Sequence, residues 1–168
     1  MFDNLTMVVK DLKVLESNQL LFYILSIYTL RAVYTDLSSL KITDNLNKTF
    51  LLLRIVAGVV SAALATYAGI NIGLEITMDN VFGLAVGGLL VLIPAMIKMK
   101  PMGGDIKFCA VLGFWLGYEG IIAALIMGVL MFWVLAALSG EMRKMMNIPF
   151  APFIAIGYGL SMLTVSVL

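Results

Sequence analysis

The sequence contains no histidine and only one cysteine, Cys109, in 168 residues. Zinc sites, histidine-dependent catalytic triads and an intrachain disulfide are therefore excluded, and no metal or other cofactor is expected. Charged residues make up 12% of the chain, whereas about 25% is typical of a globular protein. The net charge of +1 gives no reason to expect a nucleic-acid partner. Any catalysis must use carboxylates, hydroxyls, lysines or arginines.

Hydrophobic residues are abundant: they make up 62% of the chain and raise its mean hydropathy to +1.05. Apolar runs long enough to cross a bilayer cover residues 20–35, 49–69, 80–97, 106–138 and 149–168. The fourth run is too long for one span, and Glu119 lies near its middle, between Gly117 and Gly120. Because a glutamate is costly at mid-bilayer and glycines favour a turn, we expect two helices joined there.

These runs predict an all-α, polytopic membrane protein with six transmembrane helices in a single domain, residues 1–168. The basic residues support that number, because cytoplasmic loops are enriched in lysine and arginine. With six spans, Lys10 and Lys13 lie outside and the other nine basic residues lie on the cytoplasmic side. These nine are Arg31, Lys41, Lys48, Arg54, Lys98, Lys100, Lys107, Arg143 and Lys144. Residues 1–18 are expected to form an amphipathic segment at the membrane surface.

Two aspartates, Asp36 and Asp105, stand at the cytoplasmic ends of predicted spans. Between them the chain is expected to cross the membrane an even number of times. Both aspartates then lie on the same side and can approach each other. The dipole of the first helix disfavours Asp36 at its end unless that carboxylate is paired or needed, and Arg31 or Lys41 could pair with it. Asp105 directly precedes the fourth helix, where aspartate is a favoured N-cap. A purely structural role for both residues therefore stays open.

If the two carboxylates are held close together, they can share a proton. One then activates water while the other donates to the scissile carbonyl oxygen. Gly103 and Gly104 precede Asp105 and have no side chains, so they would let a substrate backbone approach the pair. Lys107, like Lys98 and Lys100, is expected to contact anionic lipid headgroups, with substrate binding as a secondary role.

Three segments resemble motifs of the type IV prepilin peptidases and preflagellin peptidases, which are membrane aspartic proteases with a GxGD motif. They are residues 36–42 (DLSSLKI), 102–107 (MGGDIK) and 148–157 (IPFAPFIAIG). In the second segment Met102 stands where the motif has its first glycine. The resemblance implies that Asp36 and Asp105 are catalytic and that Gly103, Gly104 and Lys107 support them. It also implies the short, peptidase-only form of the family, without N-methyltransferase activity.

We therefore expect an aspartic endopeptidase of the plasma (inner) membrane whose active site faces the cytoplasm. Its expected substrates are prepilin- or preflagellin-like precursors of type IV pilus systems, from which it removes the short leader, and membrane lipid surrounds it. One alternative is a lipoprotein signal peptidase, although the chemistry of that enzyme lies on the outer side and its motifs are absent. The other is a noncatalytic membrane scaffold or small transporter, in which Asp36 and Asp105 form a cap and an ion pair.

Overall fold

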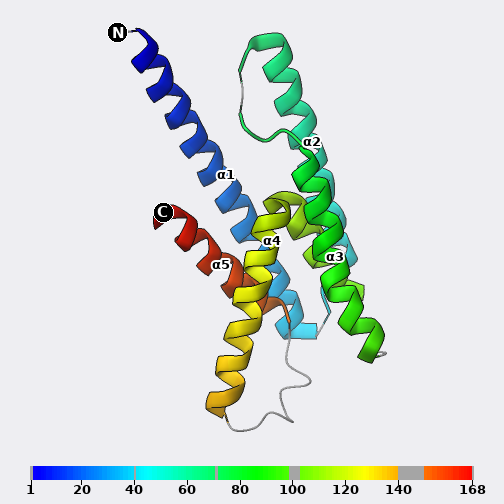
Figure 1. The fold of residues 1–168 in the computed structure, drawn as a ribbon. Coiled ribbons are helices and arrows are strands. Elements are labelled where there is room, and N and C mark those ends of the chain that lie inside the picture. Colours follow the sequence, from blue (N-terminus) through cyan, green and yellow to red (C-terminus); the bar gives the residue numbers. More distant parts are fainter. Residues whose placement is uncertain (1, 40, 71, 99–102, 140–149, 168) are drawn as a thin grey trace.

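The computed structural model describes residues 2–39, 41–70, 72–98, 103–139 and 150–167. All regular structure in these segments is helical and no strand occurs in them, so the predicted all-α fold is confirmed there. The helices are α1 (Phe2–Ser39), α2 (Asp44–Ala68), α3 (Met78–Lys98), α4 (Gly103–Ser139) and α5 (Ala151–Val167). Figure 1 shows that the C-terminal end of α1 lies among the other helices, while its N-terminal end projects away from them.

Helix α1 is longer than the sequence analysis predicts at both ends. It begins at Phe2, so the segment expected at the membrane surface is continuous with the first apolar run. It ends at Ser39, so Asp36 lies within the last turn and not at the end of the helix. Leu25, Tyr28, Ala32 and Asp36 are all buried, and their spacing places them on one face of α1. This face turns the first aspartate toward the bundle interior.

The predicted turn inside the fourth apolar run is confirmed at Gly117, which interrupts α4. Its φ of 78° and ψ of 176° are not helical, and residues other than glycine rarely adopt such a positive φ. A Cβ atom placed on Gly113 would lie 3.4 Å from the Ile121 side chain. These two residues would be about 12 Å apart along a continuous helix. The second half of α4 therefore folds back beside the first, and Figure 1 shows the change of direction.

Glycines allow the halves of α4 to pack closely against α3 and α5. A Cβ atom at Gly83 of α3 would overlap the backbone of Gly113 and Gly117. Similarly, a Cβ atom at Gly157 of α5 would overlap the backbone of Ala124 and Gly128. Within a membrane, small residues of this kind replace the hydrophobic effect as the basis of helix association, because they let two backbones approach.

A buried arginine, Arg54, holds the non-helical segment between α2 and α3 against the bundle through hydrogen bonds. Its guanidinium donates hydrogen bonds to the carbonyl oxygens of Leu74, Glu75 and Phe114 and to the side-chain oxygen of Asn80. Only 2% of Arg54 is exposed, so it does not belong among the cytoplasmic surface charges to which the sequence analysis assigned it. Buried irregular backbone needs donors of this kind, because its carbonyl groups lack helical partners.

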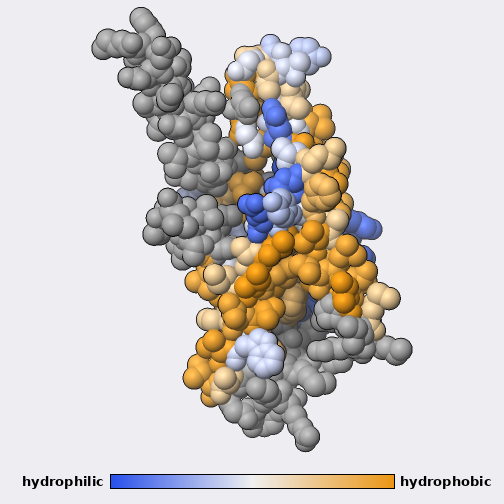
Figure 2. Space-filling view, in the orientation of Figure 1, coloured by the Kyte–Doolittle hydropathy of each residue, from blue (hydrophilic) through white to orange (hydrophobic). Residues whose placement is uncertain are grey.

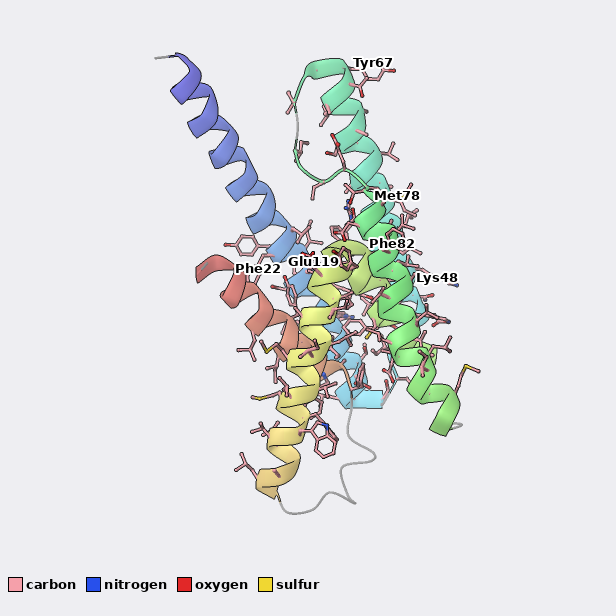
Figure 3. All side chains as sticks on the ribbon, in the orientation of Figure 1. Phe22, Lys48, Tyr67, Met78, Phe82 and Glu119 are labelled. Atoms are coloured by element: carbon pink, nitrogen blue, oxygen red, sulfur yellow. The ribbon has the colours of Figure 1, made fainter. Side chains whose placement is uncertain are left out.

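The described helices expose large apolar side chains, as Figure 2 shows in orange over much of the visible face. Tyr67, Met78 and Phe82 are 91%, 76% and 62% exposed, and in Figure 3 they point away from the bundle. By length and composition, Asp44–Ala68 and Gly103–Leu135 are apolar enough to cross a membrane, and Met78–Ile93 and Ala151–Leu160 are shorter apolar helices. These features fit a membrane protein, while the six predicted spans are not established by them.

Candidate active site

Asp36 is held between the end of α1 and the start of α5. It is 3% exposed, and its Oδ2 accepts a hydrogen bond of 2.8 Å from the backbone N–H of Ala151. Ala151 is the first residue of α5, and the N-terminal end of a helix carries partial positive charge that favours an anion. The dipole of α1 disfavours a carboxylate in its last turn, and the start of α5 offsets this effect. The pairing with Arg31 or Lys41 that the sequence left open is not what holds Asp36.

Asp105 lies in the first turn of α4, beside Asp36. The helix begins at Gly103, so Asp105 is its third residue and does not occupy the N-cap position suggested by the sequence. Its side chain is partly buried, and it lies close enough to Asp36 for the two carboxylates to interact electrostatically. The structure thus brings together two acidic groups that are 69 positions apart in the chain.

The two glycines before Asp105 have different surroundings. A Cβ atom on Gly104 would lie 3.0 Å from the carbonyl oxygen of Ile42, in the segment that joins α1 to α2. A Cβ atom on Gly103 would have no described neighbour within 4 Å. The expectation that both glycines leave space for a substrate is therefore wrong for Gly104. The backbone of Ile42 occupies the space beside it.

Lys107 forms an ion pair with Asp44, the first residue of α2. Its Nζ lies 2.8 Å from both carboxylate oxygens, and the two side chains are 54% and 52% exposed. This ion pair joins α4 to α2, and the expected contact of Lys107 with lipid headgroups stays a prediction. The side chain of Lys98 and the whole of Lys100 lie outside the described residues, as do Met102, Ile148 and Pro149 of the motifs.

The sequence analysis missed Asn47, a buried amide that contacts two other helices near the aspartates. Its Oδ1 accepts a hydrogen bond of 2.8 Å from the Tyr28 hydroxyl of α1, and its Nδ2 donates to the Gly104 carbonyl of α4 at 3.4 Å. A signal was present in the sequence: Asn47 and Arg54 are seven positions apart, which places both polar residues on one face of an apolar helix.

The geometry of these residues suits acid and base catalysis by carboxylates. Asp36 and Asp105 belong to different helices, interact electrostatically and are at least partly removed from solvent, and both effects disfavour the simultaneous ionisation of two acids. Among the described residues, no three His, Cys, Asp or Glu side chains cluster as metal ligands would. The hydroxyls of Ser38 and Ser39 bond to backbone carbonyls of their own segment.

Comparison with known proteins identifies the family of the chain. The model of the type IV leader peptidase family matches residues 21–160, which include both aspartates and all the residues that surround them. The chain belongs to the type IV leader peptidase family. It is also 39% identical over 82 residues to the prepilin leader peptidase/N-methyltransferase of Bacillus subtilis (strain 168). That alignment covers 46% of this chain and 33% of the Bacillus protein. No solved structure matches this member of the family.

Proposed function

We propose that this leader peptidase family member is a membrane aspartic endopeptidase in which Asp36 and Asp105 are the catalytic pair. The observation that carries the proposal is that the carboxylates of Asp36, in the last turn of α1, and Asp105, in the first turn of α4, lie close enough to interact electrostatically. The match of the family model over residues 21–160 supports a peptidase activity, and the named activity of the Bacillus relative points to prepilin-like precursors as substrates.

The reaction needs one ionised and one protonated carboxyl group. The ionised group removes a proton from water, whose oxygen then attacks the scissile carbonyl carbon. The protonated group donates its proton to the carbonyl oxygen, which gives a gem-diol. The first carboxyl group then passes the proton from water to the amide nitrogen as the C–N bond breaks, and the second regains a proton from the gem-diol. The leader leaves as a carboxylic acid and the mature protein as an amine. The N–H of Ala151 fixes the orientation of the Asp36 carboxylate during these steps. The mechanism uses no metal and forms no covalent intermediate with the enzyme.

The substrate approaches from the cytoplasmic side in this proposal. Six membrane spans, with α4 counted as two, place the start of α2 and the start of α4 on the face that is rich in basic residues. Gly103 lies two positions before Asp105, and a Cβ atom there would have no described neighbour within 4 Å, so an extended peptide backbone could approach it. The apolar helix of the precursor would remain in the membrane while its leader reaches the two aspartates.

Cleavage of a co-expressed prepilin tests the proposal. We expect Asp36→Asn and Asp105→Asn each to abolish cleavage, while Asp44→Asn, which removes an exposed carboxylate from the start of α2, retains it. Because Asp105 lies in the first turn of α4 and is not the N-cap, its substitution should cost only about 0.3–1 kcal/mol of helix stability. Thermal unfolding in detergent checks that the variants fold.

Two outcomes would overturn the proposal. Folded Asp36→Asn or Asp105→Asn protein that still cleaves the prepilin would show that the carboxylates are structural, as expected for a scaffold or transporter. Cleavage of a lipoprotein precursor in place of the prepilin would assign the aspartates to a signal peptidase of another class.

A further inference from the structure

The side chain of Asn47 connects the two helices that carry the aspartates. Its amide uses its oxygen for the Tyr28 hydroxyl and its nitrogen for the Gly104 carbonyl. Only 3% of Asn47 is exposed, so water does not compete for these hydrogen bonds. We refer to Tyr28, Asn47 and the Gly104 carbonyl as the amide bridge.

Each end of the amide bridge is directly connected to one carboxylate. Gly104 is joined to Asp105 by a peptide bond, so a fixed Gly104 carbonyl also fixes the backbone that bears the carboxylate. Tyr28 lies eight positions before Asp36 on the same buried face of α1, about 12 Å away along the helix axis. Since an α-helix is stiff over two turns, the position of Tyr28 determines the position of Asp36.

Other hydrogen bonds and ion pairs of these helices join α4 to α2, as between Trp115 Nε1 and the Phe50 carbonyl, whereas the amide bridge also reaches α1. Helices in a membrane gain little from apolar burial against one another, so interhelical hydrogen bonds and close packing set their positions. The rings of Phe50 and Phe108 pack on Tyr28, with centroids 4.4 Å and 5.2 Å away, and keep α1, α2 and α4 together. Ring contacts tolerate sliding, whereas the two hydrogen bonds of Asn47 have defined directions. The bridge therefore sets the register of α1 relative to α4.

We propose that Asn47 is a positioning residue that sets the separation of the Asp36 and Asp105 carboxylates through the amide bridge. This inference rests on the proposed function, because it assigns Asn47 an effect on the reaction through the catalytic pair. Asn47 itself does not touch the substrate or the reacting atoms. A displacement of about 1 Å between reacting groups can lower a rate by about 100-fold, so the loss of the bridge should reduce turnover.

Tyr28→Phe is the most informative variant, because it removes one hydroxyl and retains the ring contacts with Phe50 and Phe108. Asn47→Ala removes both hydrogen bonds of the amide. Thr29→Val is the matched control: Thr29 is also buried on α1, but its hydroxyl bonds to carbonyls of its own helix and connects nothing else. The three full-length proteins are compared with wild type in lipid vesicles, with a prepilin as the substrate.

We expect kcat to fall about tenfold or more in Tyr28→Phe and Asn47→Ala, while KM changes little, since the substrate contacts remain. The double variant should be no slower than Asn47→Ala, because both substitutions break the same bridge. Thr29→Val should keep the wild-type kcat. A wild-type kcat in folded Tyr28→Phe and Asn47→Ala protein would overturn the inference, as would an equal loss in Thr29→Val.

The spacing can also be measured without catalysis. With Cys109→Ala as the background, Asp36→Cys and Asp105→Cys are joined by a short thiol-specific cross-linker, and the yield is compared with and without Asn47→Ala. We expect Asn47→Ala to lower the yield at least about threefold, and an unchanged yield would contradict a role in spacing. If Asp36→Asn and Asp105→Asn still cleave the prepilin, the proposed function fails. If Asp36→Asn and Asp105→Asn are inactive but Tyr28→Phe and Asn47→Ala keep the wild-type kcat, only this inference fails.

Discussion

Substitution of Gly104 by alanine tests whether the backbone before Asp105 must lie against the segment between α1 and α2. A Cβ atom at this position would lie 3.0 Å from the Ile42 carbonyl oxygen, 3.4 Å from its nitrogen and 3.5 Å from its Cβ. The first of these contacts is tighter than nearly all real Cβ contacts, so one of the two backbones must move by a few tenths of an ångström. Ile42 is itself buried, which limits its freedom to move.

The expected magnitude follows from two opposing effects. Alanine stabilises a helix relative to glycine by about 1 kcal/mol, and this gain offsets part of the strain against Ile42. The free energy of unfolding should therefore change little. Catalytic groups, in contrast, are sensitive to small displacements: about 1 Å can lower a rate about 100-fold, so a shift of Asp105 by a few tenths of an ångström is costly. We expect kcat to fall about tenfold in Gly104→Ala.

Gly103→Ala is the control for this prediction, because its added Cβ would have no described neighbour within 4 Å. Both variants are assayed for prepilin cleavage and for thermal unfolding in detergent. Gly103→Ala should keep the wild-type kcat, and a higher KM in this variant would place the substrate beside Gly103. The reasoning is refuted if Gly104→Ala cleaves as fast as wild type, or if both variants lose kcat equally.

Three further predictions concern stability, metal dependence and topology. Arg54→Lys should lower the unfolding temperature, because lysine cannot donate to all four oxygen acceptors of Arg54. Each buried acceptor left without a hydrogen bond costs about 1–3 kcal/mol. An unchanged unfolding temperature would contradict this prediction. EDTA should leave cleavage unchanged, whereas loss of cleavage with recovery on addition of zinc would oppose the carboxylate mechanism. In a Cys109→Ala background, Met142→Cys should resist labelling from outside intact cells, and its labelling would exclude the six-span topology.

The parts of the structure that depend on local chemistry could be predicted from the sequence. The break in α4 was predictable because Glu119 and two glycines interrupt an apolar run, and only a residue such as Gly117 adopts the φ found there. The pairing of Asp36 and Asp105 could be anticipated from the motifs around them and from the count of crossings. In both cases the signal lies within a few residues of the feature that it predicts.

Features that depend on tertiary contacts were missed or misassigned. The sequence left an N-cap role open for Asp105 because aspartate often occupies that position, but α4 begins earlier, at Gly103. Gly104 was read as space for a substrate, because only the folded chain shows Ile42 against it. No local sequence pattern predicts the hydrogen bond from the first backbone N–H of α5 to Asp36, because the two residues are 115 positions apart in the chain.

Arg54 shows why a count of charges cannot by itself define a membrane topology. The positive-inside rule applies to residues in loops and near the membrane surface, and it assigns every arginine the same weight. Arg54 is the eleventh residue of α2, about 15 Å along the helix from its start, where a charge is costly unless it has partners. Three of its four partners come from residues 74–80, which form no apolar run with α2 in the sequence, and the fourth is Phe114 of α4. The predicted charge asymmetry survives without Arg54, since the six-span prediction still assigns eight basic residues to the cytoplasmic side and two to the outside. Arg54 acts within the fold as the donor that holds irregular backbone inside the bundle.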